Sequence, residues 1–307
     1  MKILLTGANG QLGNSIREIS KRNNAKIYAF SKNELDITNE KQIFTVVEKI
    51  KPNFIINAAA YTNVDNSENN PDQAFSINQH GVRKIGMVSK DFNIPLIHVS
   101  TDFVFDGENQ EGYLEDDKKN PINSYGLSKL RGEEEIIKLS GQFIIIRTSW
   151  IFSEFGKNFL KTIYNNLKSG KKLKIVSDQI GCPTYAYDIG EFIFAITERL
   201  HSGFQQNEIY HLAGSHDCSW YEFACLINKV AFHEGLVEKD NLIQPIESFL
   251  YDGNIALRPK YSILNSDKAR KDFSLMPTKI KNAILKSILN IENLSLIHIS
   301  EPTRRAI

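Results

Sequence analysis

A tyrosine and a lysine stand four residues apart in Tyr125-Gly-Leu-Ser-Lys129. In a helix this spacing places both side chains on one face. A free tyrosine has a pKa of about 10 and is a poor acid–base catalyst near neutral pH. A nearby ammonium favours the phenolate and lowers the tyrosine pKa. We therefore expect Tyr125 to exchange a proton with a substrate, with its pKa lowered by Lys129.

The Tyr-x-x-x-Lys pattern alone is weak, because the chain contains it three times: Tyr28/Lys32, Tyr125/Lys129 and Tyr164/Lys168. Context favours the middle pair. It follows an apolar run that ends in Ser100-Thr101, and Asn123 or Ser124 could cap a helix that begins there. In a carbonyl reduction, Thr101 would donate a hydrogen bond to the substrate oxygen. Tyr125 would supply the proton as hydride reaches the carbon.

A glycine-rich turn directly follows the first apolar run. Gly7, Gly10 and Gly13 come after residues 2–6, and a helical pattern follows them. Gly7 permits a tight turn, Gly10 lets a pyrophosphate approach the backbone, and Gly13 allows close helix–strand packing. The helix N-terminus offers N–H groups and a positive dipole end. This arrangement predicts a dinucleotide site, although a ligand-free turn would use the same residues.

The end of the second apolar run bears on the choice of nicotinamide cofactor. Residues 26–30 lead into Ser31 and Lys32, with no carboxylate at the position that usually holds the ribose 2′-OH in NAD sites. Ser31 and Lys32 could bind a 2′-phosphate, which favours NADPH and leaves NADH open. Lys32 could also be a solvated surface residue. Asp36 either accepts from the adenine amino group or caps the helix near Asn39.

Small side chains follow the third apolar run. Ala58, Ala59 and Ala60 end it, where they would let the backbone pass close to the cofactor or would simply pack in the core. Lys129, besides its effect on Tyr125, is also expected to hold the nicotinamide ribose.

The elements that must position these residues alternate along the first half of the chain. Strands are expected at residues 2–6, 26–30, 54–58, 96–99 and 143–148. Helices are expected at 11–21, 40–49, 71–78 running on towards 90, and 124–139. Apolar strands separated by helices predict a doubly wound parallel α/β sheet of the Rossmann type, with a ligand at the carboxyl ends of its strands.

Beyond residue 150 the alternation loosens. We expect a dinucleotide-binding domain at 1–150 and a smaller, irregular α/β substrate lobe at 151–292, with helices at 158–168, 189–200, 220–230 and 277–289. A strand at 208–212 is expected to return to the main sheet. Residues 293–307 show no helix period and predict a disordered or non-native tail.

Bulk composition excludes several classes of protein. The formal net charge of the 307 residues is only +1, so the chain has no strong positive field to attract nucleic acid or an anionic membrane. Three cysteines without a Cys-x-x-Cys motif argue against a disulfide framework and suit a reducing cytoplasm. No apolar stretch reaches the ~18 residues of a membrane span. We expect a cytoplasmic enzyme that binds a small molecule, with no nucleic-acid or membrane partner and with a homodimer left open.

Motifs spread over most of residues 1–265 resemble the extended short-chain dehydrogenase/reductases, and within them the dTDP-4-dehydrorhamnose reductase family. The matching stretches are Thr6-Gly-Ala-Asn-Gly-Gln-Leu-Gly13, Leu35-Asp-Ile-Thr38, Asn57-Ala-Ala-Ala-Tyr-Thr62 with Val64-Asp65, Ser100-Thr-Asp-Phe-Val-Phe-Asp-Gly107, Tyr125-Gly-Leu-Ser-Lys129, Arg147-Thr-Ser-Trp150, Asp178-Gln-Ile-Gly-Cys-Pro-Thr184 and Arg258-Pro259.

The resemblance implies a role for each matching position. The catalytic trio is Thr101, Tyr125 and Lys129. Positions that match the cofactor site are Gly10, Gln11, Leu12, Asp36, Ile37, Ala60, Tyr61, Thr62 and Val99. Thr101, Asp102 and Trp150 match positions that touch the sugar, although Trp150 could instead pack in the core. Gln179 and Arg258 look placed for the nucleotide diphosphate, which an arginine can bind with its planar fork.

The implied activity is NADPH-dependent reduction of the C4 keto group of dTDP-4-dehydro-L-rhamnose to dTDP-L-rhamnose, a step in cell-surface polysaccharide biosynthesis. The alternatives are another dTDP-4-keto-6-deoxyhexose as substrate, or a non-catalytic NADP-binding regulatory subunit. The latter is expected to lack the trio that this chain has.

Three positions depart from the family pattern. Phe103 replaces a tyrosine, which leaves the identity of the sugar open. Ser31 replaces an aspartate, which weakens the case for NADH. Ser15 replaces a glutamate that some members use in a magnesium-bridged dimer, so we expect no metal site.

Overall fold

The computed structural model describes residues 1–23, 25–203, 207–238, 243–251, 253 and 255–300. At its centre lies a six-stranded sheet in which neighbouring strands are parallel. From edge to edge its strands are β10 (Glu208–His211), β5 (Phe143–Thr148), β4 (Leu96–Thr101), β3 (Phe54–Asn57), β1 (Lys2–Thr6) and β2 (Lys26–Phe30). The predicted doubly wound parallel sheet is confirmed, and β10 brings a late segment of the chain to its edge.

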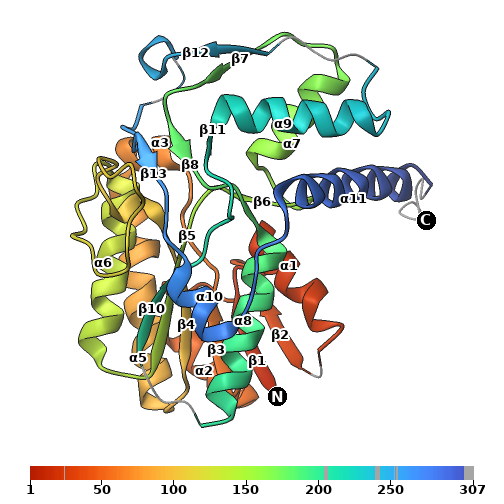
Figure 1. The fold of residues 1–307 in the computed structure, drawn as a ribbon. Helices are drawn as coiled ribbons and strands as arrows, with labels where there is room; N and C mark the ends of the chain where they lie inside the picture. Colours follow the sequence, from red (N-terminus) through yellow and green to blue (C-terminus); the bar gives the residue numbers. More distant parts are fainter. Residues whose placement is uncertain (24, 204–206, 239–242, 252, 254, 301–307) are drawn as a thin grey trace.

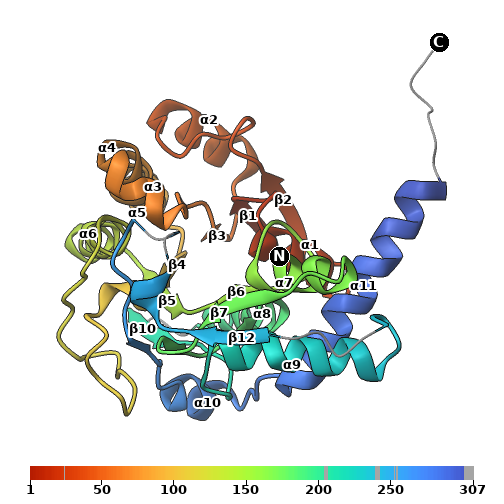
Figure 2. The ribbon, with the colours of Figure 1, turned by 90° about the horizontal axis from the view of Figure 1, so that it is seen from above.

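Helices cover both faces of this sheet (Figures 1 and 2). One face carries α1 (Gln11–Ser20), α8 (Ala186–His201) and α10 (Asp267–Phe273). The other carries α2 (Glu40–Ile50), α5 (Val82–Asp91) and α6 (Ser124–Leu139). Strands β3 and β5 are buried along their whole length, as a parallel sheet covered on both faces requires.

The strand order places a topological switch point beside β1. From β1 the chain passes through α1 to β2 on one side, and then returns through α2 to β3 on the other side. Loops that leave β1 and β3 therefore diverge at their carboxyl ends. A crevice opens at such a point in open α/β sheets.

The remaining elements gather mainly beyond the carboxyl ends of the strands, in the upper part of Figure 1. The helices there are α7 (Phe159–Lys168), α9 (Trp220–His233) and α11 (Ile280–Ser300), which share an apolar core. Short strands form three small sheets. These strands are β6 (Ile151–Phe152), β7 (Leu173–Val176), β8 (Ile180–Gly181), β9 (Thr184–Tyr185), β11 (Cys218–Ser219), β12 (Ile243–Ile246) and β13 (Tyr261–Ser262).

Two helix predictions need correction. The helix expected from residue 71 towards 90 consists of α4 (Pro71–Phe75), a π-helical turn η1 (Ser76–Gly81) and α5. The helix expected at 277–289 is α11, which begins later and continues to Ser300. Glu292 fixes this part of α11 against α7, because its carboxylate accepts from the Tyr164 hydroxyl at 2.9 Å and from Lys168 Nζ at 2.8 Å. Once begun, a helix extends at little cost.

The tail predicted at 293–307 is thus helical as far as Ser300, and residues 301–307 lie outside the described part of the chain. A short helix that the sequence did not predict, α3 (Val64–Asn69), precedes α4. Short 3-10 turns occupy Asp102–Val104 and Ser248–Leu250. Among the described residues, no helix is long and apolar enough to cross a membrane.

Candidate active site

A cavity of about 570 Å³ lies at the switch point between β1 and β3. The N-terminus of α1 borders it. Gly10 is the N-cap of that helix and provides no side-chain cap, so the first N–H groups of α1 are left for another partner. An anion such as a pyrophosphate satisfies such groups and is favoured by the helix dipole. The residues present therefore fit a dinucleotide.

The other two glycines of the turn are fixed by close packing. Gly7 has φ +71°, and a Cβ on it would lie 2.6 Å from the carbonyl carbon of Ala58. A Cβ on Gly13 would lie 2.3 Å from the carbonyl oxygen of Gly7. The missing side chain of Gly7 lets the turn approach Ala58, and that of Gly13 lets the start of α1 pack on the turn.

Most of the predicted cofactor residues line this one cavity. They are Gly7, Gly10, Gln11, Leu12, Gly13, Lys32, Asp36, Ile37, Ala58, Ala59, Ala60, Thr62, Val99, Tyr125 and Lys129. The structure thus brings together residues from the segments that follow β1, β2 and β3 with residues of β4, α1 and α6. Ser31 and Tyr61 are not among the lining residues.

Ser31 is hydrogen-bonded to a carboxylate that was not predicted from the sequence. Both its N–H and its hydroxyl donate to Glu34, at 2.8 and 2.6 Å. These hydrogen bonds hold the pKa of Glu34 below its usual value. Lys32, not Ser31, is therefore the cationic or polar group that the end of β2 presents to the cavity.

Asp36 does not cap α2, so that alternative is wrong. Its carboxylate accepts from the Thr38 N–H at 2.9 Å and from the Thr38 hydroxyl at 2.8 Å. Asn39 is the N-cap and accepts from the Gln42 N–H. Asp36 instead forms a local turn on the wall of the cavity.

Tyr61 is held from the side of the π-helical turn. Asn78, fully buried in η1, accepts from the Tyr61 N–H at 2.8 Å and donates to its carbonyl oxygen at 3.0 Å. Asn78 Nδ2 also donates to Ser128 Oγ at 2.9 Å. Because Ser128 precedes Lys129 on α6, this amide joins the loop after β3 to the candidate catalytic helix. π-Helical turns often occur at functional sites.

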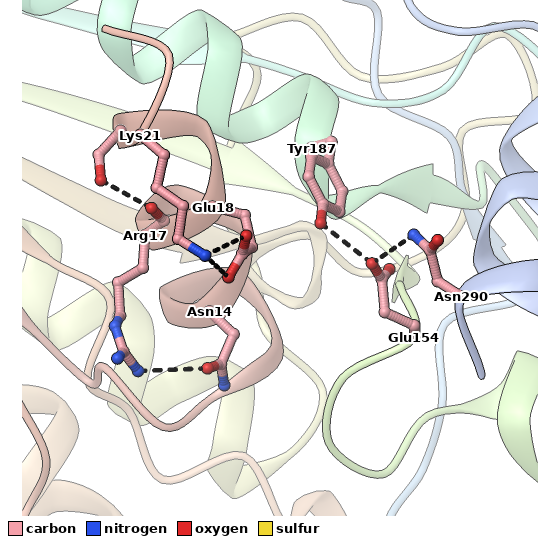
Figure 3. A network of polar contacts seen from close by, with 8 residues as sticks. Asn14, Arg17, Glu18, Lys21, Glu154, Tyr187 and Asn290 are labelled. Atoms are coloured by element: carbon pink, nitrogen blue, oxygen red, sulfur yellow. Dashed lines mark hydrogen bonds and ion pairs between the residues drawn. The ribbon is translucent and has the colours of Figure 1, made fainter. Parts of the chain in front are cut away.

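The loop 153–157 forms a further border of the cavity through Gly156 and Lys157. Figure 3 shows how it is anchored: Glu154 lies between Tyr187 of α8 and Asn290 of α11, at 3.0 and 2.8 Å. The bonds of Lys21 to Glu18 and of Arg17 to Asn14, drawn in the same figure, join residues of α1 and its C-cap only. The loop is thereby tied to two helices that are distant in sequence.

Tyr125 lies in the first turn of α6, next to Thr101 at the end of β4. Asn123 caps the helix by accepting from the Gly126 N–H at 2.7 Å. Gly126 packs so tightly on Phe103 that a Cβ there would lie 2.1 Å from the Phe103 carbonyl oxygen. This contact draws the start of α6 onto the segment after β4 and brings Tyr125 close enough to Thr101 for that hydroxyl to affect the pKa of the phenol.

The expectation that Lys129 lowers the pKa of Tyr125 is wrong for this structure. Burial raises the pKa of Tyr125 to about 12, with an opposing effect of the Thr101 hydrogen bond and a further rise from the charge of Asp102. The Lys129 ammonium donates instead to the Val99 carbonyl oxygen at 2.7 Å. Tyr125 is therefore protonated at neutral pH, which is the form that a proton donor requires.

Lys129 is fully enclosed, and burial lowers its pKa to about 8, with Glu133 one turn along α6 acting in the opposite direction. Its Nζ also lies 3.5 Å from Nε2 of His98. The pKa of His98 is held well below its usual value by burial and then by the Lys129 charge, so this imidazole is neutral.

A buried polar chain fixes the tautomer of His98. Asn57 Oδ1 accepts from the Thr6 hydroxyl at 2.7 Å and from the Ala59 N–H at 3.2 Å. Asn57 Nδ2 must then donate to His98 Nδ1, 3.1 Å away. The neutral ring then carries its proton on Nε2, which faces Lys129 Nζ at 3.5 Å without a hydrogen bond between these two donors. The sequence pattern does not reveal this chain of hydrogen bonds, because Thr6, Asn57 and His98 lie on three different strands.

Asp102 follows Thr101 and is buried beside it. Its Oδ1 accepts from the Thr101 hydroxyl at 2.9 Å. Burial raises the pKa of Asp102 to about 7, against the opposing effect of the neighbouring Thr101 and Ser262 hydroxyls. Neither Thr101 nor Asp102 lines the large cavity, but Ser262 borders a second one. The pair thus lies between the two cavities.

The second cavity, of about 210 Å³, brings together the remaining predicted substrate residues, Trp150, Gln179 and Arg258. Its other lining residues are Phe103, Phe159, Lys174, Ile175, Val176, Trp220, Tyr251, Pro259 and Ser262, and of these the sequence motifs include only Phe103 and Pro259. Trp150 lies flat against Trp220, with ring centroids 3.4 Å apart and an angle of 4° between planes. An aromatic surface with a few cations beside it suits a nucleotide sugar.

Arg258 is already paired in this structure. Its Nη2 lies 2.7 Å from Oδ2 of Asp65, on α3. Phe103 forms an edge-to-face contact with Tyr125, with ring centroids 5.7 Å apart. The side chain at the position where the family has a tyrosine thus contacts both the candidate proton donor and the second cavity.

Comparison with known proteins identifies the family. The profile of the RmlD substrate binding domain family matches residues 1–293. The chain belongs to this family. A dTDP-4-dehydrorhamnose reductase from Aggregatibacter actinomycetemcomitans is 39% identical over 285 residues, which are 92% of this chain and 97% of that protein. The spore coat polysaccharide biosynthesis protein SpsK of Bacillus subtilis is 34% identical over 283 residues, covering 92% and 95% of the two chains.

Solved structures agree with this assignment. The crystal structure of dTDP-4-dehydrorhamnose reductase from Bacillus anthracis in complex with NADP has a TM-score of 0.85 and 36% identity. The match covers 94% of this chain and 99% of that one. It therefore extends over both cavities and is not limited to the parallel sheet.

Proposed function

We propose that this protein reduces the C4 keto group of dTDP-4-dehydro-L-rhamnose to dTDP-L-rhamnose with NADPH. The observation that carries the proposal is the position of Tyr125. It lines the large cavity, lies beside the Thr101 hydroxyl, which acts on its pKa, and contacts Phe103 of the second cavity. A proton donor between the two cavities can reach a substrate group that lies between a cofactor in the first cavity and the rest of the substrate in the second. The names of the family relatives and the NADP complex of one of them support the same activity.

Bound NADPH would supply the hydride. Gly10, with the open N-terminus of α1, would hold its pyrophosphate, and Lys32 would pair with its 2′-phosphate. Thr101 would orient the sugar oxygen towards Tyr125, which is protonated at neutral pH and can donate its proton. Lys129, held by the Val99 carbonyl oxygen on the wall of the same cavity, would bind the nicotinamide ribose.

The second cavity would hold the rest of the nucleotide sugar. The indole of Trp150 offers a flat apolar surface for the sugar, while Gln179 and Arg258 offer donors for the diphosphate. A cytoplasmic location and a homodimer are part of this proposal, and they do not affect the chemistry.

The direct test is NADPH oxidation with substrate that is formed in situ by a dehydratase and an epimerase. We expect turnover that disappears when the epimerase is omitted. Turnover without the epimerase would instead identify the dehydratase product, another dTDP-4-keto-6-deoxyhexose, as substrate. NADPH binding without any turnover would contradict the proposed reaction.

A further inference from the structure

A single carboxylate organises the chain segment that carries Arg258. Oδ1 of Asp65 accepts from the backbone N–H groups of Ile255 and Ala256, at 3.0 and 3.1 Å. Oδ2 accepts from Arg258 Nη2 at 2.7 Å. Asp65 lies on α3, 190 or more residues earlier in the chain. We call residues 255–261 the strap.

Two further contacts hold the strap on elements that surround Tyr125. Asn123, the N-cap of α6, donates through Nδ2 to the Leu257 carbonyl oxygen at 2.8 Å. The Tyr261 N–H donates to the Gly107 carbonyl oxygen at 3.1 Å. The strap thus spans from α3, past the start of α6, to the wall of the second cavity, which Arg258 and Pro259 line.

The same short helix also contacts the catalytic helix. Glu68 of α3 accepts from the Ser124 N–H and from the Ser124 hydroxyl, both at 2.8 Å. Ser124 directly precedes Tyr125. Two carboxylates of α3 therefore hold the strap and the first residue of α6 in one arrangement, which links the position of Arg258 to that of the proton donor.

The ion pair leaves part of the guanidinium available. Nη2 binds Asp65, whereas Nε and Nη1 of Arg258 make no hydrogen bond with any part of the chain that the structure describes. An arginine offers a rigid planar fork of donors, so one edge can bind a carboxylate while the other binds a phosphate oxygen. Because Arg258 also lines the second cavity, the available edge is next to the space for the nucleotide sugar.

We propose that Asp65 is a positioning residue for substrate, which aims Arg258 at the diphosphate of the nucleotide sugar. This inference rests on the proposed function for the class of ligand. Asp65 does not touch the ligand itself. It fixes the guanidinium before binding, so that less side-chain freedom is lost when the diphosphate arrives.

The key variant is Asp65→Asn, which keeps an oxygen for the strap N–H groups and loses the charge against Arg258. The pair is partly exposed, so its loss should hardly alter the melting temperature. We expect the dissociation constant for dTDP to rise about tenfold, and that for thymidine to stay within about twofold. In turnover, KM for the sugar nucleotide should rise while kcat and KM for NADPH change little.

A double-mutant cycle with Arg258→Ala tests whether Asp65 acts through Arg258. Asp65→Asn should add no further loss of dTDP affinity in that background. Asp72→Asn, an exposed aspartate on the neighbouring α4, is the matched control and should behave as wild type.

Three results would overturn the proposal. Unchanged or tighter dTDP binding in Asp65→Asn would show that the carboxylate does not orient Arg258. Equal losses for dTDP and thymidine would indicate a structural effect on the whole cavity. If the wild-type protein binds no dTDP at all, both the proposed function and this inference are contradicted. The first two results contradict only the inference about Asp65.

Discussion

The indole rings of Trp150 and Trp220 stack in parallel at the wall of the second cavity, although the two residues are 70 positions apart in the chain. Both indoles are half-buried. Trp220 is the first residue of α9 and is fixed there by a capping box between Ser219 and Glu222. Trp150 has φ +45°. Its indole packs so closely on Gly181 that a Cβ on that glycine would lie 2.4 Å from Cε2 of Trp150. Unusual backbone conformations of this kind are concentrated at ligand sites.

Trp220 should therefore support the indole that is expected to face the sugar. We predict that Trp220→Ala raises KM for the nucleotide sugar about fivefold or more, because an aromatic pair contributes about 0.5–1.5 kcal/mol beyond its buried area. KM for NADPH should stay unchanged. The control is Phe232→Ala, on the same helix with a side chain that is 47% exposed. Equal effects of the two substitutions would show that Trp220 only stabilises α9.

Tyr125 is distinguished from the other tyrosines by its neighbours. Tyr125→Phe keeps the buried ring and removes the proton, so turnover should fall about a thousandfold, within the range for a positioned general acid. NADPH binding, followed by fluorescence, should be almost intact. Tyr164→Phe tests the same sequence pattern at a site where the hydroxyl bonds Glu292, and it should keep its activity. Substantial turnover by Tyr125→Phe would exclude the proton-donor role.

The first half of the fold could be predicted because its signals are local. The glycine turn after β1 and the alternation of strands and helices depend on neighbouring residues. Tertiary pairing determines the rest. Strands of two residues such as β6 and β9 exist only through their partner, and the pair of Asp65 and Arg258 joins residues 193 positions apart. The pKa of Tyr125 was misjudged because the sequence does not show how deeply the phenol is buried.

Lys32 is the candidate for selecting NADPH over NADH. It lines the cavity at the end of β2, whereas the Ser31 hydroxyl is taken by Glu34. Lys32→Ala should raise KM for NADPH about tenfold and leave KM for NADH nearly unchanged, since only NADPH has a 2′-phosphate. Ser31→Ala should have little effect on either. Lys41→Ala, an exposed lysine on α2, serves as control. Equal changes for both cofactors would refute the contact with the 2′-phosphate.

Lys129 should set the upper limit of the pH range for activity. Burial lowers its pKa from 10.5 to about 8, so the ammonium is present below that pH and is lost above it. Tyr125, with a pKa raised to about 12, stays protonated throughout this range. Of the groups that face Lys129, the buried His98 is neutral and Glu133 favours the charge. We therefore predict that kcat declines above about pH 8.

The variant Lys129→Arg separates this explanation from others, because a guanidinium stays charged beyond pH 12. Its activity will be lower than that of wild type, but what remains should not decline between pH 8 and 10. Asp102→Asn removes the other group whose pKa lies near neutrality, at about 7, and should leave the decline above pH 8 in place. Circular dichroism at each pH verifies that the protein stays folded. A decline at pH 8 that persists in Lys129→Arg would assign it to a different group.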